Sequence, residues 1–390
     1  MISFPVLSLL SMLLKPAAVM IDMEGLPDTG LDTSSWKPGV LPSLQDIWDL
    51  NDMQIAAKNV LSGKDYAYYR TGSLNEYTYQ ANLGIYSKIK INGFGFRDVS
   101  NLQTSTTILG YNFSYPFFIA PAAKAGRANK SAEASLASAA GKSGILYVPS
   151  ISSTLSIEKI AQAGVEGQVM FHQEYIWANT SQVIDELDRI KAAGFKAIFL
   201  TVDNTGINGI RTRSMRYTTD SDMRTSHAAN FDLDSLAAFR NLTDLPIVPK
   251  GIKTWQDALA CLHLGFPAIY VSNHGGRVLD GVPTSVEILL DIRKHAPEVF
   301  EGMEVYADGG VRRGTDALIL LALGARAVGL GRPPMFANIW GEEGVLRLID
   351  LFGQEMKTSM QLMGVSNVNK LNSSYVSSVS FVVVSALSDF

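Results

Sequence analysis

The chain has 390 residues, of which 47% are hydrophobic and 18% are charged, and its formal net charge at pH 7 is −4. This is the composition of a globular protein with a large core, and no dense run of lysine and arginine points to a nucleic-acid partner. The single cysteine, Cys261, excludes an intrachain disulfide, and five histidines without paired spacing predict no metal site.

Two segments precede the predicted domain. Residues 1–20 are largely apolar and resemble a secretory signal peptide, although they lack a basic n-region and are too short to span a bilayer. Asn-x-Ser/Thr sequons would suit secretion and glycosylation, but several fall in segments predicted to be core. We therefore expect an intracellular protein, in the cytoplasm or a peroxisome-like compartment, in preference to a secreted one. Residues 21–42 contain several glycines and prolines and are predicted to be a linker.

The domain is predicted to begin with a helix over Ser43–Ser62, in which Ser43 is the cap and apolar residues recur at helical spacing. A tyrosine-rich stretch, Asp65–Gly72, follows and stops at a glycine. Its tyrosines either pack half-buried at a helix end or contact a ligand, and the local sequence leaves both interpretations open.

From residue 117 onwards, short apolar runs alternate with helical patterns. The predicted strands are Phe117–Ala120, Ile145–Val148, Gln168–Phe171, Ala197–Val202, Pro246–Val248, Ala268–Val271, Glu304–Ala307 and Ala325–Gly329. The predicted helices include Ser131–Lys142, Thr180–Ala193, Thr254–Leu264, Ser285–His295 and Gly314–Leu323. This alternation predicts an α/β fold, a TIM (β/α)8 barrel with an N-terminal helical extension. A doubly wound open sheet is the alternative. That fold requires a glycine-rich fingerprint after the first strand, and the sequence there, Pro121-Ala-Ala-Lys124, is not one.

In a barrel, the residues that follow the eight parallel strands line a single mouth. The residues at these positions are small or polar: Ala122, Ala123, Ser150, Gln173, Tyr175, Thr201, Asp203, Lys250, Ser272, His274, Arg277, Asp308 to Gly314, Gly331 and Arg332. Such a rim indicates a ligand site and not a purely structural protein.

Two loops rich in glycine and arginine follow the last two predicted strands. They are Asp308–Gly314 (DGGVRRG) and Gly329–Pro333 (GLGRP). Glycines expose backbone N–H groups to an anion, and arginines supply forked donors. Since the corresponding loops of barrels commonly hold phosphate, we predict a phosphate-bearing substrate or cofactor here.

The sequence SNHGGR, which ends at Arg277, places a histidine and an arginine at one strand end. Asp203, after the fourth strand, can pair with His274 and stabilise the imidazolium that forms when His274 takes a proton. Arg277 and a second arginine, Arg211 or Arg213, could bind a carboxylate through parallel hydrogen bonds. Together these residues predict proton abstraction beside a carboxylate, next to a phosphate-bearing cofactor.

Several segments together carry a resemblance to one family. They are Tyr68-Tyr69, Thr106–Gly110, Ile119–Pro121, Gln173–Tyr175, Gly194–Ile198, Leu200–Asp203, Lys250-Gly251, Ser272–Gly275 with Arg277, Asp308–Gly314 and Gly331–Pro333. The pattern resembles the FMN-dependent α-hydroxy acid dehydrogenase/oxidase family, which includes glycolate oxidase, lactate oxidase, mandelate dehydrogenase and the flavin domain of flavocytochrome b2. The resemblance covers residues 43–375.

The resemblance implies a role for each matching residue. His274 would take a proton from the substrate, Asp203 would support its charged form, and Tyr175 would contact the substrate hydroxyl. The substrate would be bound by Tyr68, Tyr175, Arg211 and Arg277. FMN would be held by Ala122, Ala123, Ser150, Gln173, Thr201, Lys250, Ser272, Asp308, Gly309, Gly310, Arg312, Gly331 and Arg332.

The chain departs from the family pattern on the substrate side. The segment Asn204–Arg213 fits only with one inserted residue, so Arg211 and Arg213 compete as the second substrate arginine. The lid after that arginine is shorter than in typical members, which leaves the size of the substrate open. Ala122 stands where the family has threonine.

Two further departures concern the charge near the first strand and the C-terminus. Lys124 and Arg127 put positive charge close to the first strand end. Val376–Phe390 does not continue the family pattern and is predicted to be an atypical tail.

The predicted function is FMN-dependent oxidation of a 2-hydroxy acid to the 2-oxo acid, in a homo-oligomer. Oxygen is the expected electron acceptor, and a quinone- or cytochrome-linked dehydrogenase is the alternative. Too few residues precede the barrel for a haem domain, which argues against a flavocytochrome b2 arrangement. An FMN-binding isomerase or a non-catalytic barrel is the alternative of another class. The isomerase would not need the pair His274 and Arg277, which is present. A non-catalytic barrel would be expected to lose His274, Lys250 or Arg277, and none of the three is lost.

Overall fold

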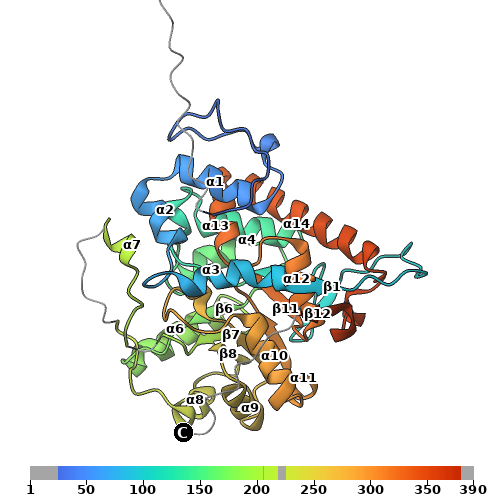
Figure 1. Cartoon of the computed structure of the whole chain (residues 1–390). Coiled ribbons are helices and arrows are strands. Elements are labelled where there is room, and N and C mark those ends of the chain that lie inside the picture. Colours follow the sequence, from blue (N-terminus) through green and yellow to red (C-terminus); the bar gives the residue numbers. More distant parts are fainter. Residues whose placement is uncertain (1–24, 205, 218–224, 379–390) are drawn as a thin grey trace, which may run out of the picture.

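Eight parallel strands form the central sheet of the computed structural model, which describes residues 25–204, 206–217 and 225–378 (Figure 1). They are β4 (Phe117–Ile119), β5 (Leu146–Tyr147), β6 (His172–Glu174), β7 (Ile198–Thr201), β8 (Ile247–Ile252), β9 (Ala268–Val271), β10 (Glu304–Ala307) and β11 (Ala327–Leu330). Neighbouring strands pair in the order β5-β4-β11-β10-β9-β8-β7-β6. The two ends of this sheet meet, because parallel bridges join Tyr147 to Met170 and Ser150 to Gln173. The predicted TIM barrel is therefore confirmed.

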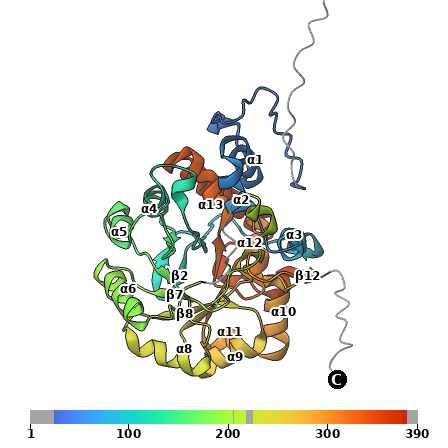
Figure 2. The same cartoon turned by 90° about the vertical axis from the view of Figure 1, so that its left-hand side faces the viewer.

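Helices surround the strands (Figure 2). They are α1 (Leu50–Val60), α2 (Gly63–Arg70), α3 (Tyr77–Gly84), α4 (Glu133–Lys142), α5 (Ile157–Ala163), α6 (Thr180–Ala192), α7 (Thr212–Met215), α8 (Leu233–Phe239), α9 (Trp255–His263), α10 (Ser285–His295), α11 (Val299–Gly302), α12 (Gly314–Ala322), α13 (Arg332–Ala337) and α14 (Glu342–Leu362). In the N-terminal extension, α1 packs on α13 of this ring. Near the C-terminus, α14 packs on α4 and α12.

The third barrel strand lies later in the chain than the sequence pattern predicts. The apolar run Gln168–Phe171 precedes β6, and pairing with β7 begins at His172, opposite Ile198. The side-chain oxygen of Gln168 accepts a hydrogen bond from the Val165 backbone, so this residue closes the preceding turn. An apolar run marks burial, and burial alone does not locate a strand.

The predicted helix over Ser43–Ser62 is interrupted. Ser43 caps only a short 3-10 turn, Leu44–Asp46, and α1 starts afresh at Leu50. The carboxylate of Asp49 accepts hydrogen bonds from two backbone N–H groups of the first turn of α1, in a capping box with Asp52. A carboxylate that satisfies the exposed N–H groups of a helix start fixes the boundary there.

The barrel interior is filled by aromatic side chains and is closed at its amino-terminal end. Phe199 lies against Tyr270 and Tyr306, with ring centroids 5.4 and 5.7 Å apart. Residues of the hairpin formed by β2 (Thr106–Ile108) and β3 (Tyr111–Phe113) join this interior cluster. The Leu109 N–H of the hairpin turn donates to Glu304 at the start of β10, so the hairpin covers this end of the barrel.

The structure describes part of each end of the chain, and the predicted tail begins with a strand. Residues Val376–Ser378, predicted as the start of an atypical tail, form strand β12, which pairs antiparallel with β1 (Ile89–Ile91). The predicted linker, from residue 25, contains no helix or strand before Leu44. The predicted leader over residues 1–20 and the tail from residue 379 lie outside the described residues. No helix in the described ranges is long and apolar enough to cross a membrane.

Candidate active site

A cavity of about 610 Å3 opens where the barrel strands end at their carboxyl termini. It brings together most of the site residues predicted from the sequence: Tyr68, Ala122, Ala123, Ser150, Gln173, Tyr175, Thr201, Arg211, Lys250, His274, Arg277, Asp308, Gly309, Gly310, Arg312, Gly331 and Arg332. The other two, Asp203 and Ser272, lie behind this lining, where each contacts His274.

His274 and Asp203 form a hydrogen-bonded pair beside the cavity. His274 Nδ1 is 2.9 Å from Asp203 Oδ1, and the Asp203 side chain is only 1% exposed. Burial acts to raise the pKa of Asp203, but the His274 imidazole and Lys250 outweigh it, so its pKa is lowered. An ionised Asp203 holds the proton on Nδ1 and leaves Nε2 of His274 free to accept one.

The backbone that presents His274 is strained. His274 has a φ of 57°, and Gly275 and Gly276 follow with φ of 64° and 70°. The turn is held because the Asn273 side chain accepts the Gly276 N–H, and the His274 N–H donates to Ser272 Oγ. A non-glycine residue in this conformation is costly, and such strain is concentrated at functional sites.

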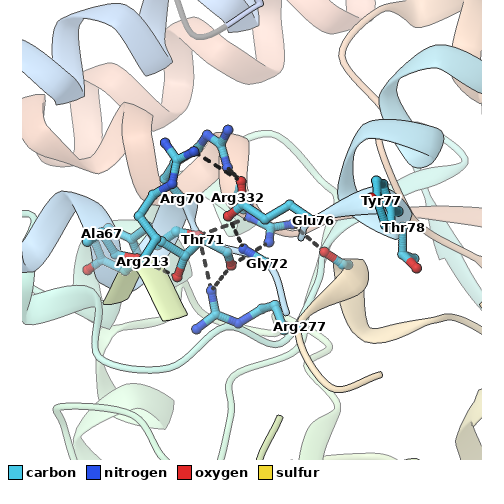
Figure 3. Close-up of polar contacts among 12 residues, drawn as sticks. Ala67, Arg70, Thr71, Gly72, Glu76, Tyr77, Thr78, Arg213, Arg277 and Arg332 are labelled. Carbon is cyan, nitrogen blue, oxygen red and sulfur yellow. Dashed lines mark hydrogen bonds and ion pairs between the residues drawn. The ribbon is translucent and has the colours of Figure 1, made fainter. Parts of the chain in front are cut away.

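Arg211 and Arg277 line the cavity, and Arg213 does not. Figure 3 shows Arg277 beside the end of α2, where it donates to the Thr71 carbonyl oxygen. Nη1 of Arg277 donates to the backbone carbonyls at the end of α2, and burial, with Arg211 and Arg332 nearby, lowers its pKa. Nη1 of Arg211 is buried and has no hydrogen-bond partner among the described residues. Arg213 is 52% exposed and lies 3.6 Å from Glu76. The structure therefore places Arg211, and not Arg213, at the cavity.

Tyr175 and a histidine that sequence reasoning missed form one wall. Burial raises the pKa of Tyr175, which keeps its hydroxyl protonated and able to donate a hydrogen bond. The ring of His227 stacks on Tyr175 with centroids 4.1 Å apart, and its Nδ1 is 3.2 Å from the Asn204 carbonyl oxygen. His227 follows no strand end and belongs to no recognisable motif, so no local signal could have identified it.

Four neighbouring strand ends bring a row of buried polar side chains to the cavity. Ser150 Oγ donates to Gln173 Oε1 at 2.8 Å, and Gln173 Nε2 donates to Thr201 Oγ1 at 3.0 Å. Lys250 Nζ lies 3.4 Å from Ser272 Oγ and 4.0 Å from the Asp308 carboxylate. Nearly unexposed polar groups on four neighbouring strands suit the polar edge of a planar ring.

The loops after β10 and β11 supply the predicted phosphate end. Nε of Arg312 is buried without a hydrogen-bond partner in the described part of the chain. A Cβ added to Gly331 would meet no atom within 4 Å, so its backbone is open to the cavity. Arg332 differs from expectation, because it donates to the carbonyls of Tyr69, Thr71 and Gly275; burial lowers its pKa to about 10. The unpartnered donor, the open glycine and the Arg332 charge fit the phosphate of FMN.

Comparison with known proteins agrees with this geometry. The FMN-dependent dehydrogenase family matches residues 57–230 and 215–378. Human 2-hydroxyacid oxidase 1 is 34% identical over 358 residues, which cover 84% of this chain and 95% of that protein. The L-lactate dehydrogenase (cytochrome) of Wickerhamomyces anomalus is 32% identical, and the match covers 85% of this chain but 61% of that protein.

A solved structure shows the same fold. The flavin-binding domain of baker's yeast flavocytochrome b2 superposes with a TM-score of 0.83 at 30% identity, over 86% of this chain and 88% of that one. The sequence matches, this superposition and the cavity agree on one conclusion. The chain belongs to the FMN-dependent dehydrogenase family, whose members are oxidoreductases that use FMN.

Proposed function

We propose that this protein oxidises a 2-hydroxy acid to the 2-oxo acid with FMN as its cofactor. The observation that carries the proposal is the His274–Asp203 pair, which adjoins the same cavity as Arg211 and Arg277. A base beside two guanidinium groups is what removal of a proton next to a carboxylate requires. Relatives named as 2-hydroxyacid oxidase and glycolate oxidase support this reaction.

Each side chain then has a chemical task. Arg211 and Arg277 bind the substrate carboxylate and orient the carbon that carries the hydroxyl. The substrate loses two protons and two electrons, and His274 Nε2 takes one of those protons while Asp203 stabilises the imidazolium. Tyr175 donates a hydrogen bond to the substrate oxygen. Lys250, Gln173, Arg312 and the Gly331 backbone, among others, would hold FMN, which when bound would supply the acceptor for the two electrons and the remaining proton.

We propose oxygen as the final acceptor, since the chain matches 95% of human 2-hydroxyacid oxidase 1. A cytochrome-linked reaction is the alternative, supported by the resemblance to the cytochrome-dependent lactate dehydrogenase. Stoichiometric oxygen uptake with hydrogen peroxide release would support the first, and turnover only with an added cytochrome or dye would support the second.

Anaerobic reduction of the flavin by a panel of 2-hydroxy acids of increasing size tests the proposal. The purified holoenzyme should lose its FMN absorption, and His274→Gln should keep the flavin but slow its reduction by about three orders of magnitude or more. His263→Gln, on the outer helix α9, is the matched control and should reduce at the wild-type rate. Near-wild-type reduction in His274→Gln would rule out His274 as the base.

A further inference from the structure

The cavity carries more positive charge than the cofactor and a monocarboxylate substrate would balance. Its cationic lining residues are Lys64, Lys124, Arg127, Arg211, Lys250, Arg277, Arg312 and Arg332. Asp308 is the only carboxylate among the described lining residues. A phosphate monoester contributes about two negative charges and a carboxylate one, so a cationic excess remains. The excess is local, because the whole chain has a net charge of −4.

The surplus charge gathers around one ring, that of Tyr68. The guanidinium carbons of Arg211 and Arg277 lie 5.7 and 5.5 Å from its centroid. Arg127 lies 4.5 Å and Lys124 Nζ 6.0 Å from the same centroid. The first pair is the proposed site for the carboxylate next to the hydroxyl, and the second pair comes from the segment after β4. Both pairs therefore lie close to Tyr68, in the same part of the cavity.

The second pair has an unused donor. Arg127 Nη1 is 2.6 Å from Asp65 Oδ1, which holds the guanidinium in place. Its Nε is buried and has no hydrogen-bond partner in the described ranges. The Arg127 side chain as a whole is 25% exposed and lines the cavity, so other parts of the guanidinium can meet a ligand oxygen there.

We propose that the substrate is a 2-hydroxy dicarboxylate, whose second carboxylate binds Arg127 and Lys124. This inference rests on the proposed function and narrows its substrate class. Arg211 and Arg277 would hold the carboxylate beside the hydroxyl, and Arg127 and Lys124 would hold the far one. The asymmetric partners also fix which carboxylate adjoins His274, since only one end of the ligand carries the hydroxyl.

The test compares acids of matched shape that differ in the second charge. Malate is compared with 2-hydroxy-4-methylpentanoate, and 2-hydroxyglutarate with 2-hydroxy-5-methylhexanoate, in anaerobic flavin reduction by the holoenzyme. We expect a dicarboxylate to have a kcat/KM about tenfold or more above its uncharged counterpart. That preference should weaken as salt is raised, because partly exposed charges are screened.

Two variants locate the effect. Lys124→Gln should reduce the preference for the dicarboxylate about threefold, as expected for a charge at an exposed rim. Arg127→Lys keeps the charge but loses Nε and should reduce it about tenfold. Lys130→Gln, on the same segment but outside the cavity lining, is the control and should leave the preference unchanged.

Binding gives a readout that does not depend on turnover. Titration of the oxidised holoenzyme with 2-oxoglutarate should perturb the flavin spectrum at about tenfold lower concentration than titration with 2-oxo-5-methylhexanoate, and Arg127→Lys should remove the difference. Equal reactivity and binding of the charged and uncharged acids would overturn this inference but leave the proposed function standing. A flavin that no 2-hydroxy acid reduces would instead overturn the proposed function.

Discussion

Replacement of Asp203 by asparagine removes the charge that is proposed to stabilise protonated His274. The two side chains are joined at 2.9 Å and the carboxylate is 1% exposed, so little water screens them. With charge centres about 4 Å apart and an effective dielectric constant of about 20, the lost attraction is about 4 kcal/mol. If this attraction develops fully as His274 takes the proton, the rate should fall about a thousandfold.

The assay is stopped-flow flavin reduction without oxygen, in the wild type and in Asp203→Asn. The variant should retain the FMN spectrum and its affinity for a 2-oxo acid, because neither depends on protonation of His274. Asp232→Asn, at the exposed cap of α8, is a matched control that should react as the wild type does. A rate for Asp203→Asn within threefold of wild type would show that the carboxylate does not stabilise the imidazolium.

Two further predictions concern substrate binding and stability. Arg211→Lys should raise KM about thirtyfold through loss of a forked contact, whereas Arg213→Lys should change it less than twofold; equal KM effects would contradict the placement of Arg211. Burial lowers the pKa of His172 to about 3, and both ring nitrogens lack hydrogen-bond partners among the described residues. The unfolded chain, with a histidine pKa of about 6.5, then binds more protons than the folded chain between those values, so this residue should lower the free energy of unfolding by up to about 1.4 kcal/mol for each pH unit below 6.5. The free energy of unfolding, measured by urea denaturation, should change less between pH 7 and pH 5 in His172→Leu than in the wild type. An equal change in both proteins would refute this prediction.

Local sequence patterns were sufficient for much of the barrel and of the site. The strand Ala268–Val271, the strand Glu304–Ala307 and the helix Ser285–His295 have the predicted bounds. These elements combine apolar periodicity with a capping residue or a glycine-rich stop, which are properties of neighbouring residues. The strand-end residues His274 and Lys250 were recognisable for the same reason, because parallel strands deliver them to one mouth.

Elements that depend on distant contacts were not recognisable. The third strand lies later than its apolar run, because a strand is defined by its neighbours and a run of apolar residues only by its burial. The predicted leader, an intracellular location and a homo-oligomeric state stay predictions.

The barrel and the polar residues at its strand ends could be predicted from the sequence alone, whereas the shape and charge of the proposed substrate end were decided by the tertiary structure. The choice of Arg211 over Arg213, the stacking of His227 on Tyr175 and the gathering of Arg127 around Tyr68 each join segments far apart in the chain. Such contacts depend on how loops fold over the barrel mouth, and no periodicity or local spacing encodes that arrangement.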